Sequence, residues 1–290
     1  MNHIAPVSIS KRHIDIQRVL ATKNIKLPNW LTGMFERLLH LDEINHSLYV
    51  HRDKVGLDLV NALLDTPRPD GLGIKVSVVN PENLPQGGNP IIAGNHPLGG
   101  PDGLALMRAI GTYRNDIKFP VNDFLLHIPG LAPLFIPIDK VHRNASNSRT
   151  LEHAFSENNA LLYFPAGICS RKHKDGTIRD REWKPTFIKK AVKYQRDVVP
   201  FFFDAMNRKR FYNIAHLRES VGIKFNFEMA LLPAEMFAQS GKTLRLVVGR
   251  PIPYTTFDQR HSAKEWAQLV QNHVYQLKED PTTEFSHSAT

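Results

Sequence analysis

A histidine and an aspartate six positions apart are the residue pair of this sequence best suited to chemistry. Residues 90–103 read PIIAGNHPLGGPDG, in which an apolar run with the character of a strand leads directly into Asn95 and His96. In α/β proteins the active groups commonly lie just past the carboxyl end of a strand. Asp102 precedes a helical pattern, so its carboxylate could hold one imidazole N–H and leave the other nitrogen free as a general base.

The same two residues also have a purely structural interpretation. Asp102 could cap the helix that follows, and His96 could be an ordinary loop histidine. Pro97 restricts the backbone of His96 to an extended conformation, while Gly99 and Gly100 permit a tight loop. This concentration of special residues around the pair favours the functional interpretation.

A second segment, residues 163–172 (YFPAGICSRK), has the same organisation of a strand followed by a polar tip. Gly167 allows the backbone to turn, and Ser170, Arg171 and Lys172 could then meet an anion. Between residues 171 and 190 there are eight Lys and Arg against three acidic residues, which is +5 of the formal net charge of +9. A solvated loop is the usual explanation for such a run, but its position after a strand end equally predicts an anion-binding surface.

The composition is that of a globular protein, with 290 residues of which 42% are hydrophobic and 22% charged. A single cysteine, Cys169, excludes a disulfide framework and a cysteine-based zinc site. None of the 14 histidines lies in an HExxH motif, so we expect no metal site. The basic excess favours an anionic partner, and because no nucleic-acid-binding motif is evident we expect that partner not to be a nucleic acid.

No segment has the pattern of a membrane span or an export signal. Residues 1–16 lack an apolar core, and the apolar run at residues 124–138 is shorter than the ~20 residues that a spanning helix requires and contains three prolines. The sequence therefore predicts a cytoplasmic protein, peripheral on the cytoplasmic face of the membrane.

Short apolar runs alternate with helical patterns after residue 71, which predicts an α/β fold with a mixed, largely parallel sheet flanked by helices. Strands are expected at residues 74–79, 90–94, 134–138, 161–164, 198–203, 227–232 and 244–248, and helices at 103–110, 148–157, 186–195 and 262–277.

An N-terminal helical extension is expected over residues 28–66, including a helix over residues 53–64. The breaker-rich run DTPRPDG (residues 65–71) follows it. We therefore predict an N-terminal helical region (1–66), an α/β domain (67–280) and a flexible tail (281–290). An apolar stripe in the first helix could pack on the α/β body or dock on a membrane; it comprises Trp30, Met34, Phe35 and Leu38.

Four short blocks occur in the order found in the glycerolipid (lysophospholipid) acyltransferase superfamily, which the sequence resembles over residues 74–255. These blocks are Asn95-His96…Asp102, Phe135-Ile136…Asp139-Lys140, Phe164-Pro165-Ala166-Gly167…Ser170-Arg171 and Val198-Val199-Pro200, and Val248-Gly249-Arg250-Pro251-Ile252 matches a further common feature. Four blocks in register make a more specific signal than any one alone.

The blocks also depart from the usual pattern of that superfamily. Five residues separate His96 from Asp102 where four are usual, Ala166 stands where Glu is usual, and Lys140 replaces an Arg whose bidentate fork suits phosphate. The combination HPLGG…DG with FPAG…SRK is similar to a bacterial branch of glycerol or ornithine-lipid O-acyltransferases. A lyso-amino-acid lipid with a free hydroxyl is therefore a candidate acceptor beside lysophosphatidic acid.

The resemblance implies an O-acyltransferase of membrane lipid synthesis that needs no cofactor besides its co-substrate. It would move an acyl group from an acyl carrier protein or coenzyme A thioester to the hydroxyl of a lysolipid, at an anionic membrane surface. His96 would act as general base and Asp102 would orient it. The implied substrate contacts are Asn95, Ser170, the cations Lys140, Arg143, Arg171 and Lys172, and backbone donors near Gly99, Gly100 and Gly167 for the oxyanion.

Three rival interpretations remain open at this point. Cys169 lies in the third block and could form an acyl-enzyme with His96. The same His/Asp pair could activate water, which would make the protein a lipid or thioester hydrolase. A basic protein without catalytic activity, binding a membrane or nucleic acid, is the third possibility.

Overall fold

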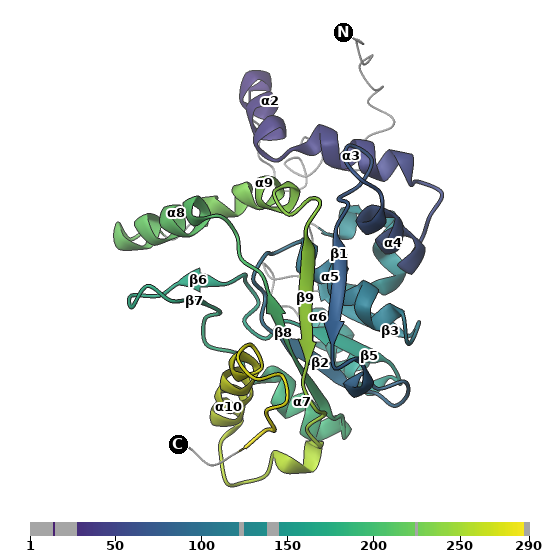
Figure 1. The fold of residues 1–290 in the computed structure, drawn as a ribbon, viewed down its shortest axis with the longest axis vertical. Helices are drawn as coiled ribbons and strands as arrows, with labels where there is room; N and C mark the ends of the chain where they lie inside the picture. The colour runs from purple at the N-terminus through teal and green to yellow at the C-terminus, as the bar shows by residue number, and fades with distance from the viewer. Residues whose placement is uncertain (1–13, 15–27, 122–124, 138–144, 224–225, 287–290) are drawn as a thin grey trace.

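The computed structural model describes residues 14, 28–121, 125–137, 145–223 and 226–286, apart from the side chains at 29–31, 127 and 145–148. One mixed seven-stranded sheet forms the centre of this part (Figure 1). Its strand order is β1 (Lys75–Val79), β9 (Thr243–Val248), β8 (Val198–Asp204), β2 (Ile91–Gly94), β5 (Ala160–Tyr163), β3 (Ile117–Val121) and β4 (Phe135–Pro137). All neighbouring strands are parallel except β8 and β9. The predicted fold class is confirmed.

Helices cover both faces of the sheet. Along the central strand β8, Phe201 and Phe203 point into one hydrophobic core and Phe202 into the other, because successive side chains of a strand alternate. The first core includes α4 (Leu57–Asp65) and α5 (Pro101–Gly111), and the second includes α6 (Ala145–Ser156), α7 (Thr186–Tyr194) and α10 (Ala263–Gln276). Both faces of the central parallel strands β2 and β5 are thus buried, as their near-continuous apolar sequences require.

The remaining elements surround this core, and several of them lie at one end and one side of the sheet (Figure 1). A small hairpin of β6 and β7 packs against α8, which extends outward beside it. The remaining helices and strands are α2 (Asn29–Leu38), α3 (Leu41–Val50), β6 (Arg171–Lys172), β7 (Ile178–Arg179), α8 (Lys209–Ser220) and α9 (Leu232–Phe237). The short 3₁₀ turns are η2 (Pro81–Asn83), η3 (Leu125–His127), η4 (Pro129–Leu134), η5 (Phe227–Leu231) and η6 (Tyr254–Thr256).

The N-terminal helices are joined to the α/β body through α4. Its buried side chains, among them Val60 and Leu64, belong to the same core as those of α5. The helix expected over residues 53–64 begins only at Leu57, because Gly56 takes a left-handed conformation (φ 61°). Of the expected apolar stripe, Met34 and Leu38 are exposed, and the Trp30 side chain lies outside the described residues. The division of the chain at residue 66 stays a prediction.

Three expectations about local structure were wrong or incomplete. The apolar run expected as a strand at residues 227–232 forms η5 and the start of α9, because Glu228 within it is drawn into a buried ion-pair cluster. Strand β3 was missed because Pro120 interrupts its pattern. Helix α8 was missed because its sequence is rich in polar residues.

None of the helices in the described residues combines the length and apolarity that crossing a bilayer requires. Nor does this part of the chain contain three or more His, Cys, Asp or Glu side chains grouped so that they could share a metal ion.

Candidate active site

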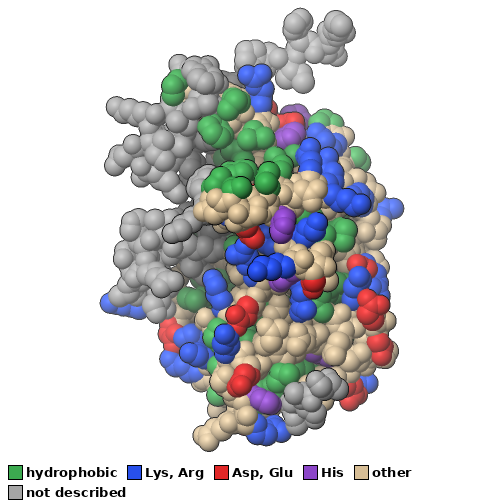
Figure 2. Space-filling model, turned by 90° about the vertical axis from the view of Figure 1, so that its left-hand side faces the viewer, with side chains coloured by type: hydrophobic (Ala, Val, Ile, Leu, Met, Phe, Trp, Pro, Cys, Tyr) green, Lys and Arg blue, Asp and Glu red, His purple; other side chains and the backbone are tan. Residues whose placement is uncertain are grey.

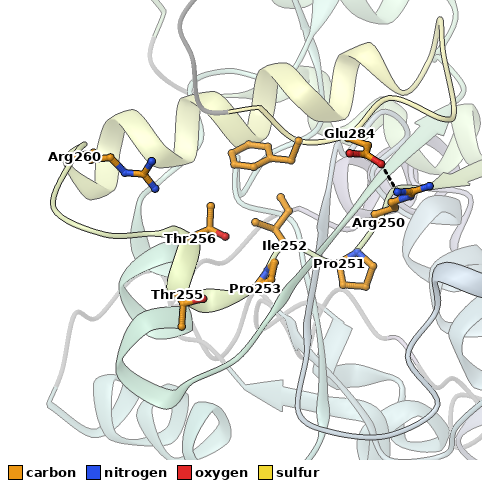
Figure 3. A pocket seen from close by; sticks show the side chains of 9 residues that line it. Arg250, Pro251, Ile252, Pro253, Thr255, Thr256, Arg260 and Glu284 are labelled. Carbon is orange, nitrogen blue, oxygen red and sulfur yellow. Dashed lines mark hydrogen bonds and ion pairs between the residues drawn. The ribbon is translucent and has the colours of Figure 1, made fainter.

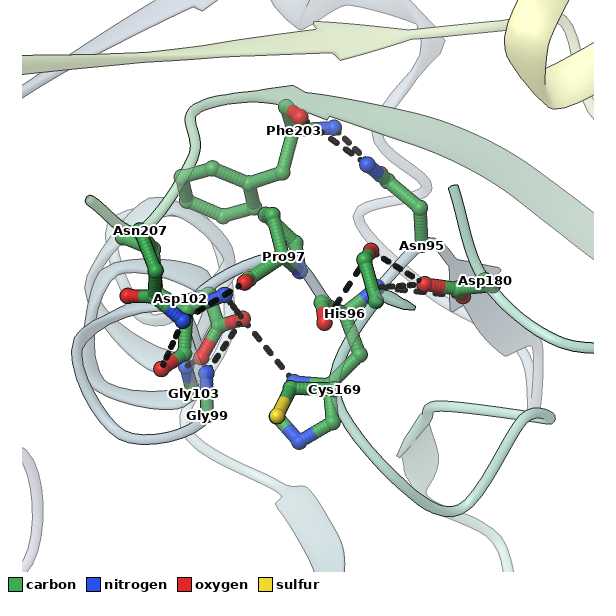
Figure 4. Close-up of polar contacts among 12 residues, drawn as sticks. Asn95, His96, Pro97, Gly99, Asp102, Gly103, Cys169, Asp180, Phe203 and Asn207 are labelled. Atoms are coloured by element: carbon green, nitrogen blue, oxygen red, sulfur yellow. Dashed lines mark hydrogen bonds and ion pairs between the residues drawn. The ribbon is translucent and has the colours of Figure 1, made fainter. Parts of the chain in front are cut away.

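The loop that leaves the carboxyl end of β2 brings His96 and Asp102 together (Figure 4). The distance from His96 Nδ1 to Asp102 Oδ2 is 2.9 Å. Asp102 is the second residue of α5, and Gly100 occupies the N-cap, so the purely structural interpretation of Asp102 as the cap is wrong. The extra residue in the spacing is absorbed by the glycine pair, where Gly99 adopts a φ of 97° that is open to glycine and costly for other residues.

The Asp102 carboxylate is fully buried and saturated with donors. Oδ2 accepts backbone N–H bonds from Leu98 (2.9 Å) and Gly99 (3.2 Å) besides the imidazole, and Oδ1 accepts one from Gly103 (3.0 Å). Burial acts to raise the pKa of this carboxyl, but His96 and the N–H groups together hold the pKa below its ordinary value. Asp102 is therefore ionised, and its Oδ2 accepts the hydrogen bond from His96 Nδ1.

The imidazole of His96 is held by ring stacking as well as by its hydrogen bond to Asp102. It stacks on the Phe164 ring with the centroids 4.1 Å apart and the planes 13° from parallel. Because an ionised carboxylate only accepts hydrogen bonds, Nδ1 carries the proton and Nε2 is left as the basic nitrogen. The side chain is 15% exposed, and among the described residues Nε2 has no hydrogen-bond partner. This nitrogen is free to take a proton from a substrate.

The backbone of the dyad loop is fixed by residues that the sequence patterns did not single out. Asp180 accepts the His96 backbone N–H on both carboxylate oxygens, each at 3.2 Å, and Asn207 donates to the carbonyls of Pro97 (3.2 Å) and Leu98 (3.5 Å). Neither residue lies in a recognisable motif. Asp180 stands in a basic run where it reads as a counter-charge, and its contact with His96 spans 84 residues.

Several residues expected to contact substrate are instead part of this supporting structure. The side chain of Asn95 is buried and joins β2 to β8, donating to Phe203 O (2.9 Å) and accepting from Phe203 N (2.6 Å). Ser170 is also buried, and its Oγ donates to Asp180 (2.6 Å). Both side chains are buried and hydrogen-bonded within the protein, which favours a supporting role, and their contact with substrate stays a prediction.

The expectation that Arg171 meets an anionic substrate is contradicted in the same way. Arg171 is 2% exposed, and its Nη2 lies 3.1 Å from Glu228 Oε1, a carboxylate that also binds Arg218 Nε at 2.8 Å. A buried guanidinium must be paired, and η5 supplies the partner 57 residues away. Lys172, the next residue, is half-buried on the hairpin, and Lys140 and Arg143 lie outside the described residues.

A lysine that the sequence patterns did not single out lies over the turn of the third block. Gly167 has a φ of 71°, and Lys184 Nζ lies 3.3 Å from the position that a Cβ at Gly167 would take. The backbone N–H of Lys184 also donates to Pro165 O (3.2 Å). This exposed lysine stands next to the segment whose Phe164 stacks on the His96 imidazole.

Of the backbone donors expected to hold the oxyanion, two are already occupied. The N–H of Gly99 donates to Asp102, and that of Gly167 donates to Phe164 O at 3.0 Å. The N–H of Gly100 has no partner among the described residues. The structure thus narrows the three expected donors to one.

Cys169 is poorly suited to act as a nucleophile. It is 1% exposed, and its Sγ lies 3.0 Å from Arg171 Nη1. Burial raises the pKa of the thiol despite the neighbouring guanidinium, so the reactive thiolate is disfavoured.

A separate cavity of about 470 Å³ lies at the opposite end of the sheet (Figure 3). Its lining includes Arg250, Ile252 and Phe285. Ile252 bridges to Val198, the first residue of β8, whereas His96 follows the carboxyl end of the parallel strand β2. The cavity therefore plays no part in the chemistry of the dyad.

A model of the acyltransferase family matches residues 18–283. The chain therefore belongs to that family, within the lysophospholipid acyltransferase superfamily. The resemblance seen in the four blocks is thereby confirmed, and the protein is an acyltransferase. Two curated relatives, both lyso-glycine lipid O-acyltransferases, are 40% identical to it over 270 residues.

These relatives come from Phocaeicola vulgatus and Bacteroides thetaiotaomicron, and the match covers 91% of this chain and 95% and 97% of theirs. Among solved structures, the 1-acyl-sn-glycerophosphate (LPA) acyltransferase PlsC from Thermotoga maritima aligns with a TM-score of 0.47 and 18% identity, over 90% of this chain and 92% of that one.

Proposed function

We propose that this protein transfers a fatty acyl group from an acyl thioester to the hydroxyl of a lysolipid, with His96 as general base. The observation that carries the proposal is the 2.9 Å contact between His96 Nδ1 and the buried, ionised Asp102, which leaves Nε2 basic and accessible. The names of the two curated relatives support a lyso-glycine lipid as the first acceptor to test.

The reaction requires one proton to move twice. As the acceptor hydroxyl attacks the thioester carbonyl, its proton passes to His96 Nε2 and a C–O bond forms. The C–S bond then breaks, and the leaving thiolate takes the proton from Nε2. Asp102 keeps Nδ1 protonated throughout and stabilises the imidazolium between the two steps. No covalent enzyme intermediate is needed, in agreement with the buried state of Cys169.

The negative charge that develops on the thioester oxygen needs a donor close to the dyad. The backbone N–H of Gly100 opens α5 beside Asp102 and is the expected donor that is not already engaged. A helix N-terminus adds a favourable partial positive charge at this position. We therefore assign the oxyanion to Gly100.

The acceptor head group requires a cation at the rim of the site. Arg171 cannot serve, because Glu228 already neutralises it in the interior. Lys184, next to the turn at Gly167, presents an exposed ammonium, which suits a carboxylate head group as a point charge. The acyl donor, carrier protein or coenzyme A, is to be identified by offering both.

Docking on an anionic membrane surface is the remaining part of the proposal. Four exposed apolar residues lie at the end of α8, in the turn that follows it and at the start of η5: Leu217 (63% exposed), Val221 (61%), Ile223 (46%) and Phe227 (43%). The face of the molecule that carries α8 shows hydrophobic side chains above a band of Lys and Arg (Figure 2). Such a combination suits insertion into the head-group region of a bilayer.

The decisive experiment is an assay of the purified protein with lyso-glycine lipid or lysophosphatidic acid and either acyl-coenzyme A or acyl carrier protein thioester. Mass spectrometry then separates acylated lipid from free fatty acid. We expect acylated lipid, lost in His96→Ala with unchanged folding. Free fatty acid as the main product would favour the hydrolase instead, and full activity of His96→Ala would remove the dyad from the mechanism.

A further inference from the structure

A second carboxylate stands behind the catalytic histidine, on the side away from Asp102 (Figure 4). Asp180 follows strand β7 and is 1% exposed. Besides the His96 N–H, it accepts hydrogen bonds from Ser170 Oγ (2.6 Å) and Trp183 Nε1 (3.1 Å). Three donors from different segments thus converge on one buried side chain.

The contacts form a closed ring around the backbone of His96. Its N–H donates to Asp180, its C=O accepts from Ser170 N at 2.8 Å, and the Ser170 hydroxyl returns to Asp180. Because both backbone groups of His96 are fixed, the Cα–Cβ bond has a fixed direction and the imidazole enters the site at a set depth.

The ring is itself anchored to a rigid element. The backbone N–H of Asp180 donates to the Tyr275 hydroxyl (2.7 Å), and its carbonyl accepts from Gln271 Nε2 (3.3 Å). Both partners belong to α10, which has a complete capping box at its N-terminus and packs on the second core. The position of His96 therefore depends on a helix more than 170 residues further along the chain.

The residue that holds the His96 backbone is a carboxylate, although a neutral side chain could make the same hydrogen bond. Burying an unpaired carboxylate is energetically costly, whereas a neutral amide could accept the same backbone N–H at lower cost. Burial raises the pKa of the Asp180 carboxyl, while Ser170 and a protonated His96 act against that rise. The negative charge is thus favoured most when the imidazole becomes positive.

We propose that Asp180 is a positioning residue for acyl transfer, which aims the His96 imidazole through its backbone and stabilises the imidazolium together with Asp102. The inference rests on the proposed role of His96 as general base. It assigns catalytic consequence to a residue outside all four family blocks.

The test is Asp180→Asn, which keeps the size of the side chain and removes its charge. The amide NH₂ of Asn cannot accept a hydrogen bond, so one of the contacts from Ser170 Oγ or Trp183 Nε1 is lost and the support of the His96 backbone shifts. We expect kcat to fall about 10- to 100-fold, the loss that a small misplacement of a reacting group produces, with KM for both substrates nearly unchanged. Asp175→Asn, in the exposed turn of the same hairpin, is the matched control and should retain full activity.

A double-mutant cycle with His96→Ala separates this inference from the proposed function. If Asp180 acts through His96, Asp180→Asn adds no further loss to the residual rate of His96→Ala. An active His96→Ala overturns the proposed function. An inactive His96→Ala beside an Asp180→Asn with wild-type kcat overturns the role of Asp180 alone, and so does a further loss of rate when Asp180→Asn is added to His96→Ala.

If Asp180→Asn does not fold, Tyr275→Phe replaces it. That variant removes only the hydroxyl that receives the Asp180 N–H and leaves the carboxylate in place. A fall in kcat of a few-fold, to about a third or less, with unchanged KM supports the positioning role, because orientation of the reacting group is what the contact supplies. Wild-type kcat in Tyr275→Phe contradicts it.

Discussion

Replacing Asp102 by Asn tests the dyad where its geometry is best defined. Oδ2 serves three donors, His96 Nδ1 and the N–H groups of Leu98 and Gly99, while Oδ1 serves only Gly103. The amide oxygen of Asn should therefore take the Oδ2 position and place its NH₂ group against the Gly103 N–H. Two facing donors in a fully buried site cost about 1–3 kcal/mol of stability.

The loss of activity should exceed this loss of stability. The neutral amide oxygen can still accept a hydrogen bond from the Nδ1–H group. It no longer stabilises the charge of the imidazolium that forms during proton transfer. General-base catalysis contributes about 10²–10⁴-fold to a rate, which corresponds to about 3–5 kcal/mol of transition-state stabilisation. We expect kcat of Asp102→Asn to decrease by about 10²- to 10⁴-fold, measured as acylated lysolipid formed per folded enzyme.

A matched control is available in the same chain. Asp70 pairs with His46 Nε2 at 2.7 Å on the exposed surface near the N-terminal helices, so Asp70→Asn also breaks a His–Asp pair. This control should keep wild-type turnover. Retention of more than a tenth of the activity in Asp102→Asn, or an equal loss in Asp70→Asn, would refute the mechanism.

The same carboxylate predicts how stability depends on pH. The pKa of Asp102 is lower in the folded chain than its ordinary value of 3.8, so the folded state favours the ionised form. Its contribution is fully present above the unfolded pKa and is lost as the pH falls through the folded pKa. Asp102→Asn should therefore show a weaker loss of unfolding free energy than the wild type when chemical denaturation is repeated at decreasing pH below about 4.

Three further predictions concern other parts of the site and surface. Cys169→Ser should retain near wild-type turnover in the acylation assay, because burial already disfavours the thiolate; an inactive, folded variant would restore the thiol route. Gly99→Ala should lower the melting temperature and kcat together, since the residue has a φ of 97° and its new Cβ would lie 2.9 Å from Leu232, a cost of roughly 1–3 kcal/mol; an unchanged melting curve contradicts this. Leu217→Asp with Val221→Asp should reduce co-sedimentation with anionic vesicles while sparing activity on detergent-dispersed lysolipid, and undiminished co-sedimentation would remove α8 from the membrane surface.

The charge control for that last variant lies on the same helix. Asn213→Asp with Ser220→Asp introduces the same two negative charges at exposed polar positions of α8. It should reduce vesicle binding only slightly, because it removes no apolar contact area.

The alternation of apolar runs and helical patterns was sufficient to predict the class of the fold. Strands such as 198–204 are buried on both faces, so they are apolar throughout and are bounded by polar or turn residues. The loop after β2 was equally readable, because Pro97, the glycine pair and Asp102 constrain only their near neighbours. The dyad lies within six residues of sequence, which is why local pattern sufficed to find it.

Tertiary structure determined which residues support the dyad loop and which basic side chains are buried in ion pairs. Asp180, Arg171 and Asn95 find their partners 84, 57 and 108 residues away, and no local pattern distinguishes a buried, paired charge from a solvated one. Burial decides the matter physically, since an ionised group in the interior must be neutralised by whatever segment the fold brings beside it. The sequence by itself thus determined which histidine and aspartate lie together, because they are close neighbours in the chain, and the packing of distant segments decided which charged groups are buried and paired.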